Sequence, residues 1–135
     1  MPLDNMQYPR PLNEAVKLLF SRVPDFAKAR SQDPSFISHE REDSPYLVFG
    51  DFGLFLLQEL DENGISTANE NWMRRSFQVI DEMLTSADPE FANLIQVGVL
   101  GVLADHPEAL RLVKNNLSGP GQEKFEEWIR ISQQI

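Results

Sequence analysis

The sequence of 135 residues contains no cysteine and only two histidines, His39 and His106. Without cysteine the chain has no disulfide bond, no zinc–thiolate site and no thiol nucleophile. The segment His39-Glu40-Arg41-Glu42-Asp43 lacks the paired histidines of a helical zinc motif, and His106 precedes a proline at a predicted helix start. We therefore expect no metal site and no cofactor.

Two further features are missing: a secretory signal and a membrane-length apolar run. The first sixteen residues lack a basic segment followed by an apolar one, which, with the missing cysteine, predicts a cytoplasmic protein. The most apolar run, Tyr46 to Leu57, has twelve residues and contains Asp51, whereas a membrane span needs about 18 apolar residues. Its glycines, Gly50 and Gly53, match no phosphate-binding loop. We predict no membrane contact and no nucleotide site.

Basic residues are scarce in the middle of the chain. Residues 33–71 hold nine acidic residues and one basic residue, Arg41, and so carry −8 of the formal net charge of −9. A field of this sign repels phosphate backbones and anionic membrane surfaces, so nucleic-acid binding is not expected. A solvated acidic face is the commoner origin of such a segment, and a basic protein partner is the alternative.

What the sequence has in quantity is apolar residues at helical spacing. In the most apolar segment, Asp51, Gln58 and Glu62 recur at seven and four residues, which places them on one helical face. Ser44 and Pro45 form a typical helix start, and an Asn-Gly pair ends the segment. We predict a central helix from Pro45 to about Glu62 that is buried on most sides.

The same pattern predicts the rest of the fold, with a polar loop over residues 31–44. The fold class is all-α, a compact bundle of about six helices joined by short turns. We expect one domain, 1–135, in which 1–44 form an N-terminal helix and polar loop and 45–135 form the helical core. Five other helices are predicted. The first begins at Asn13 and breaks at Pro24, and the second begins at the capping box 67–70 and ends near Thr85. The third begins at Asp88-Pro89-Glu90, the fourth begins at Asp105 or His106, and the fifth follows the separating segment 119–121.

Two glycine pairs lie inside the two most apolar helices, at positions 50 and 53 and at positions 98 and 101. Glycine within a helix costs up to about 1 kcal/mol relative to alanine, so a structural reason is expected. Either the two helices cross at their glycines, or each pair accommodates a bulky side chain such as Phe77 or Trp128.

No catalytic pattern accompanies these helices. A G-x-S-x-G nucleophile motif is missing, and adjacent acids such as Asp81-Glu82 diverge on a helix, whereas acid–base catalysis needs acids that converge in a cleft. We therefore predict that the protein is not an enzyme. Trp72 lies either at the edge of the core or on a contact surface, and the core edge is favoured because tryptophan is usually largely buried.

One set of motifs resembles a known family. It comprises Pro45-Tyr46-Leu47 with Gly50-Asp51-Phe52, Phe77 with Ile80-Asp81 and Leu84, Asp88 followed by Asn93-Leu94-Ile95-Gln96-Val97-Gly98 and Leu103, and Leu117-Ser118-Gly119-Pro120 before Trp128. Over residues 45–130 the chain resembles small all-helical bacterial proteins of unknown function, some of which resemble immunity proteins encoded beside polymorphic toxins. This resemblance implies a protein that binds and blocks a cognate toxin, often a cationic nuclease.

We therefore expect a non-enzymatic protein-binding domain of the immunity or antitoxin type, with a basic toxin domain as partner. The alternatives are a small helical enzyme or ligand-binding domain with an unidentified pocket, and a housekeeping adaptor. The residues predicted to bind the partner are Glu40, Glu42, Asp43, Glu59, Asp61, Glu62 and Trp72.

Overall fold

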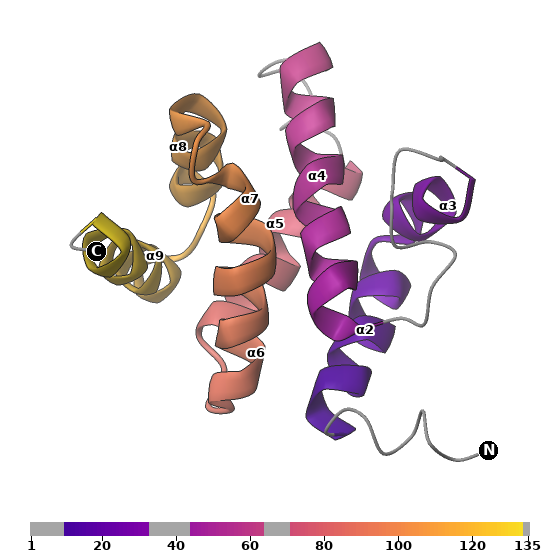
Figure 1. The fold of residues 1–135 in the computed structure, drawn as a ribbon, viewed down its shortest axis with the longest axis horizontal. Coiled ribbons are helices and arrows are strands. Elements are labelled where there is room, and N and C mark those ends of the chain that lie inside the picture. The colour runs from indigo at the N-terminus through magenta and orange to yellow at the C-terminus, as the bar shows by residue number, and fades with distance from the viewer. Residues whose placement is uncertain (1–9, 33–43, 64–70, 134–135) are drawn as a thin grey trace.

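The computed structural model describes residues 10–32, 44–63 and 71–133, and the side chains of 12–32, 44–60 and 71–131. Within these ranges every regular element is helical and no strand occurs, which confirms the all-α prediction. The elements, labelled as in Figure 1, are α2 (Arg10–Arg22), α3 (Pro24–Gln32), α4 (Pro45–Asn63), α5 (Asn71–Leu84), α6 (Pro89–Leu94), η2 (Ile95–Leu100), α7 (Gly101–Leu103), α8 (Pro107–Asn115) and α9 (Gly119–Gln133).

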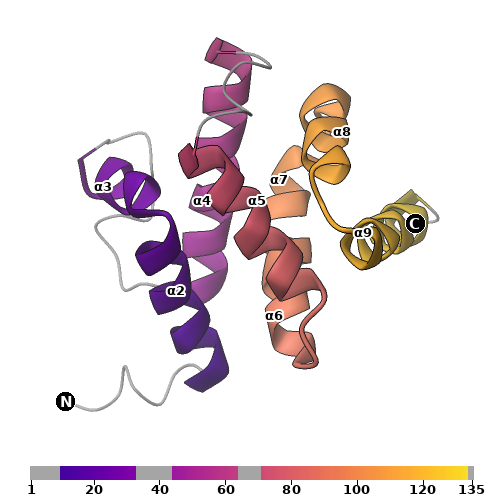
Figure 2. The same ribbon diagram turned by 180° about the vertical axis from the view of Figure 1, so that it is seen from behind.

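Helix α4 runs through the middle of the molecule, with α2 and α3 on one side and α6–η2–α7 on the other (Figure 1). The last three elements form one continuous helix, in which η2 is a π-helical turn. This helix runs in the same direction as α4. Helix α5 lies behind the pair, and α8 and α9 complete the bundle on the α7 side (Figure 2).

The core is built from the apolar stripes that predicted the helices. Phe26 of α3 is fully buried, and its ring centroid lies 5.2 Å from that of Phe52 and 5.5 Å from that of Phe55, both on α4. Clustered aromatic rings of this kind bury a large apolar area at each contact. This cluster fixes α3 against one side of the central helix.

Several predicted helix ends are confirmed. Helix α4 begins at Pro45, and its first turn closes with the Val48 N–H donating to the Ser44 carbonyl over 2.9 Å. The Asp88 carboxylate accepts a hydrogen bond of 3.0 Å from the Glu90 N–H, as expected of an N-cap. The capping box 67–70 lies outside the described residues.

Three helix limits differ from the predictions. Helix α2 begins at Arg10, three residues before Asn13. Pro24 does end α2, but it is also the first residue of α3, because proline suits the first turn of a helix. The segment 119–121 was predicted to separate two helices and instead forms the first turn of α9. The described residues therefore form seven helices when 89–103 count as one, and α3 is the additional helix.

The helices α4 and η2 cross at two of the four glycines. A Cβ atom on Gly98 would lie 2.7 Å from the Phe49 Cβ, and one on Gly53 would lie 3.1 Å from the Val102 Cβ. Both distances are shorter than ordinary packing contacts, so the two backbones can approach this closely only where a side chain is missing. The crossing hypothesis is confirmed for Gly53 and Gly98, and the alternative of a bulky neighbour such as Phe77 or Trp128 is wrong for both.

None of the helices that the structure describes is long and apolar enough to cross a membrane.

Candidate functional site

Most of the predicted partner-binding residues lie outside the described side chains. Trp72 is half-buried, and its ring centroid lies 5.1 Å from that of Phe55, so it packs at the edge of the core. Glu59 is half-buried near the end of α4. The remaining predicted residues lie outside the described side chains: Glu40, Glu42, Asp43, Asp61 and Glu62.

A surface that the sequence analysis did not identify lies on α4 and on the helix 89–103. Residues 45–58 contain one charged residue, Asp51, and it is buried; residues 91–104 contain none. Even so, both helices reach the surface. We call the surface that they share the uncharged face, and it consists of Leu47, Gly50, Leu54 and Leu57 from α4 and Asn93, Val97 and Gly101 from the neighbouring helix.

These seven residues lie on one side of the molecule, as helical geometry requires. Gly53 and Gly98 face each other across the crossing. The two helices run in the same direction (Figure 1). The residue after Gly53 and the residue before Gly98 therefore lie about 100° around their helices toward the same side of the molecule. These residues are Leu54 and Val97. In Figure 1 no described helix lies in front of this pair, whereas α5 lies behind it.

The uncharged face is apolar and accessible. Val97 is 57% exposed and Leu47 is 39% exposed, and these are two of the three large hydrophobic residues that are exposed within the described side chains. The third, Ile131, lies on α9. At one end of the face the Asn93 amide donates a hydrogen bond of 2.9 Å to the Tyr46 hydroxyl, which joins the two helices.

Within the described residues, two helical glycines of the uncharged face have room for a side chain. A Cβ atom on Gly50 would meet nothing within 4 Å, and one on Gly101 would meet only the Gln96 carbonyl oxygen, at 3.7 Å. Alanine would be more stable than glycine at such helical positions. These outer glycines differ in this respect from the inner glycines, Gly53 and Gly98. The π-helical turn η2 also lies here, and π turns in proteins frequently occur at functional sites.

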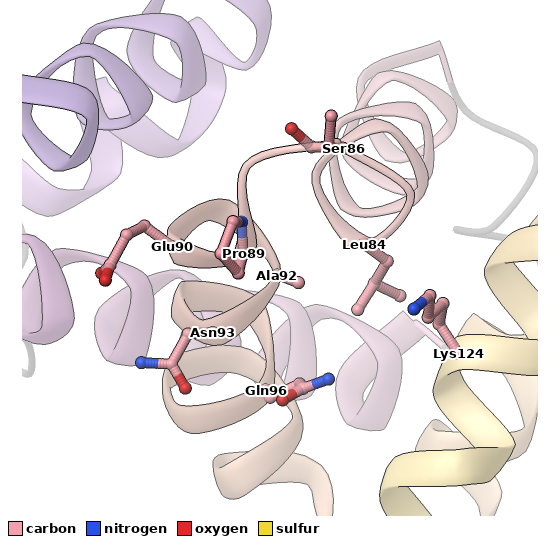
Figure 3. A pocket seen from close by; sticks show the side chains of 9 residues that line it. Leu84, Ser86, Pro89, Glu90, Ala92, Asn93, Gln96 and Lys124 are labelled. Atoms are coloured by element: carbon pink, nitrogen blue, oxygen red, sulfur yellow. The ribbon is translucent and has the colours of Figure 1, made fainter.

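A pocket of about 460 Å³ borders the uncharged face at Asn93 (Figure 3). Glu90 and Lys124 lie on its opposite sides, and Lys124 comes from α9. Among the described residues its lining has a single carboxylate, so these residues offer no pair of acids for general acid–base catalysis. The residues that line it are Leu84, Ser86, Ala87, Pro89, Glu90, Ala92, Asn93, Gln96 and Lys124.

A second pocket, of about 700 Å³, lies between α8 and α9 and includes Glu126 and Glu127. Lys114 donates a hydrogen bond of 2.6 Å to the Glu126 carboxylate. This hydrogen bond, together with the positive charge of Lys114, holds the pKa of Glu126 below its ordinary value. A carboxylate that is kept ionised in this way is a poor general acid at neutral pH.

The adjacent acids Asp81 and Glu82 each form hydrogen bonds with a residue in, or directly before, another helix. Asp81 accepts hydrogen bonds from the Ser118 N–H (3.2 Å) and from the Ser118 hydroxyl (2.9 Å) at the start of α9. Glu82 binds the Arg22 guanidinium through two hydrogen bonds of 3.0 Å. These neighbouring acids therefore diverge, as predicted, one toward α9 and the other toward α2.

Asp51 forms a buried ion pair. Its Oδ2 lies 3.0 Å from Nε of Arg30, and the two side chains are 4% and 8% exposed, respectively. The helical pattern had placed Asp51 on one polar face with Gln58, but the structure buries Asp51 against α3 and leaves Gln58 half-buried. A buried charge keeps its ionised form only when a partner compensates the loss of water, and this pair joins α3 to α4.

In the described part of the chain, no three side chains of the kinds that bind metals come together.

Comparisons with known proteins give one match. No curated protein and no solved structure matches the chain, so the resemblance to immunity proteins stays a prediction. A family model described as a domain of unknown function, DUF7674, matches residues 16–134. The match extends beyond the predicted limits of 45–130 and includes the second half of α2. The chain thus belongs to the DUF7674 family, whose function is unknown.

Proposed function

We propose that this protein is a non-enzymatic protein-binding domain that contacts its partner through the uncharged face. The observation that carries the proposal is that two adjacent helices present an exposed surface without charge in a protein whose net charge is −9. The centres of protein–protein interfaces are depleted of charged residues in the same way. A partner that covers exposed apolar surface of this kind removes it from water, and this contributes favourable binding free energy.

The test is to place a charge in the face without touching the core. Val97→Asp changes a residue that is 57% exposed, so the melting temperature should stay within a few degrees of the parent value. Binding to the natural partner, identified by cross-linking in native cells, should weaken at least tenfold, since the new carboxylate would be buried without a counter-charge. Titration calorimetry with the purified partner measures this loss.

Ile131→Asp provides a matched control, because Ile131 is 55% exposed but lies on α9, away from the face. Its affinity for the partner should equal that of the parent protein. If Val97→Asp and Leu47→Asp both bind as tightly as the parent protein, the uncharged face is not the binding surface and the proposal fails.

A more specific form of this function is the inhibition of a basic toxin. It is supported by the sequence resemblance and by the −8 charge of residues 33–71. Exposed charges act mainly on the association rate. Neutralising Glu40, Glu42 and Asp43 together should therefore slow association with a basic partner at low salt and make the rate less dependent on salt. An unchanged association rate at low salt would remove this support.

A further inference from the structure

We propose, on the basis of the protein-binding function above, that the partner places a helix along the uncharged face and that this helix is apolar in its centre and basic at both ends. The proposal rests on three features of the described residues: the outer glycines, the length of the face and the sign of the charges at its ends.

The outer glycines favour close approach by another backbone. Gly50 and Gly101 lie on neighbouring helices, and among the described residues both have room for a side chain. A side chain on either one would project outward from the uncharged face, because both positions are accessible and open. Their absence leaves a flat strip between Leu47, Leu54 and Val97. Binding of an amphipathic helix by its apolar side is one of the common modes of peptide recognition, and this strip offers an apolar surface for it.

The charges at the ends of the face specify the ends of that helix. Glu90 and Asp105 are both exposed, and they flank the uncharged segment of the helix 89–103. They are fifteen residues apart, which is about 22 Å along a helix. The sequence has no lysine or arginine between Arg75 and Arg111, or between Arg41 and Arg74. A partner helix with basic side chains about fifteen residues apart would match both the spacing and the sign.

The same charges disfavour a second copy of this chain as the partner. Both ends of the uncharged face are acidic, so two copies would bring acid against acid whether their helices ran parallel or antiparallel. Like charges that meet at an interface weaken association and exclude partners. A basic partner is attracted at both ends, and this attraction becomes weaker as salt screens it.

Synthetic peptides provide the probe. One is an eighteen-residue helical peptide with a leucine and alanine contact stripe and two lysines at each end. The matched peptide has glutamates in place of the lysines. Binding to the full-length protein is measured by fluorescence anisotropy at low and at physiological salt, and the contact surface is mapped by amide chemical shifts.

The lysine-ended peptide should bind at least tenfold more tightly than the glutamate-ended one at low salt, and added salt should reduce the difference. Gly50→Leu and Gly101→Leu should each weaken its binding at least tenfold while the melting temperature is retained. The double change Glu90→Gln and Asp105→Asn should remove most of the preference for lysine. Amide shifts should be confined to α4 and the helix 89–103.

Three results of the peptide experiments would overturn the proposal. They are equal binding of the two peptides, no binding of the lysine-ended peptide at millimolar concentration, and unchanged binding in both glycine variants. A dimer in analytical ultracentrifugation that Val97→Asp dissociates would also overturn it in favour of a second copy, while the uncharged face would remain a binding surface. The proposed function itself fails only if Val97→Asp and Leu47→Asp bind the natural partner normally.

Discussion

Helix α4 packs against its neighbours by opposite means on its two sides. Toward η2 the contact contains no charge and depends on the missing side chains of Gly53 and Gly98. Toward α3 the contact contains the buried ion pair of Asp51 with Arg30. Asp51 and Gly53 are two residues apart, which is about 200° around the helix, so a single turn of the helix combines the two kinds of packing.

The difference shows which kind of change each side tolerates. The glycine crossing leaves too little room for a side chain at Gly53 or Gly98, so it is sensitive to the addition of atoms but contains no charge that could lose its partner. The ion pair is sensitive to the loss of one partner, because the other charge would then stay buried, whereas replacement of both by apolar side chains is often neutral or stabilising. The two sides can therefore be distinguished by the kind of substitution that damages each.

The largest effect is expected on the ionic side. Asp51→Ala leaves the Arg30 guanidinium buried without this carboxylate, and the free energy of unfolding should fall by about 3–5 kcal/mol. Chemical denaturation measures the loss. The double variant Arg30→Met with Asp51→Leu removes both charges and should recover most of it. If the double variant is as unstable as Asp51→Ala, the loss is not explained by a buried charge without its partner, and the expectation is wrong.

The next largest effect is expected at the crossing. Gly98→Leu places atoms against the Phe49 backbone, where even a Cβ would lie 2.9 Å from the carbonyl carbon. Overpacking of this kind costs about 1–3 kcal/mol, which is a loss of several degrees in melting temperature for a domain of this size. Gly53→Leu should behave similarly. Parent-like melting temperatures in both variants would contradict a tight crossing.

A smaller effect is expected at the start of α9, where the Asp81 carboxylate lies against Gly121. Asp81 caps α9 through Ser118, and a Cβ on Gly121 would overlap the Asp81 carboxylate. Gly121→Ala should displace this carboxylate and so cost about 0.5–2 kcal/mol, the usual range for loss of a cap. Asp81→Ala should cost a similar amount, and the double variant should cost little more than either change. Additive losses would show that the two residues act independently.

The smallest effect should have the opposite sign. Gly50→Ala fills open space on a helix and should raise the free energy of unfolding by up to about 1 kcal/mol. Differential scanning calorimetry of Gly50→Ala beside Gly53→Ala compares an outer with an inner glycine three residues apart. A loss of stability in both variants would mean that Gly50 also has a packing role.

The sequence predicted those parts of the fold that local chemistry determines. Pro45 begins α4, and Asp88 caps α6, because each signal acts on its own backbone. The crossing was one of two hypotheses, because glycine in an apolar helix needs a structural reason, but the sequence could not decide between a crossing and a bulky neighbour or show which of the four glycines are involved. That choice depends on how α4 rotates against η2.

What the sequence missed depends on residues far apart in the chain. The segment 119–121 contains glycine and proline and was interpreted as a spacer, whereas it is helical with Asp81, which is distant in sequence, bound to the preceding Ser118. Asp51 was assigned to a polar face because its partner Arg30 lies on another helix. The site prediction relied on charge. The uncharged face was missed, since nothing local shows that the outer sides of the two uncharged segments are left uncovered by the other described helices.

The π-helical turn at Ile95–Leu100 has a consequence for the length of the chain. A π turn holds one residue more than an α turn, so every residue after it is rotated by about 100° from its place on an unbroken α-helix. Deletion of a single residue here would therefore restore an α turn and keep the buried Leu103 on its present face, whereas an α turn formed without a deletion would rotate Leu103 out of the core. We expect family members to have either this number of residues between Pro89 and Pro107 or one residue fewer.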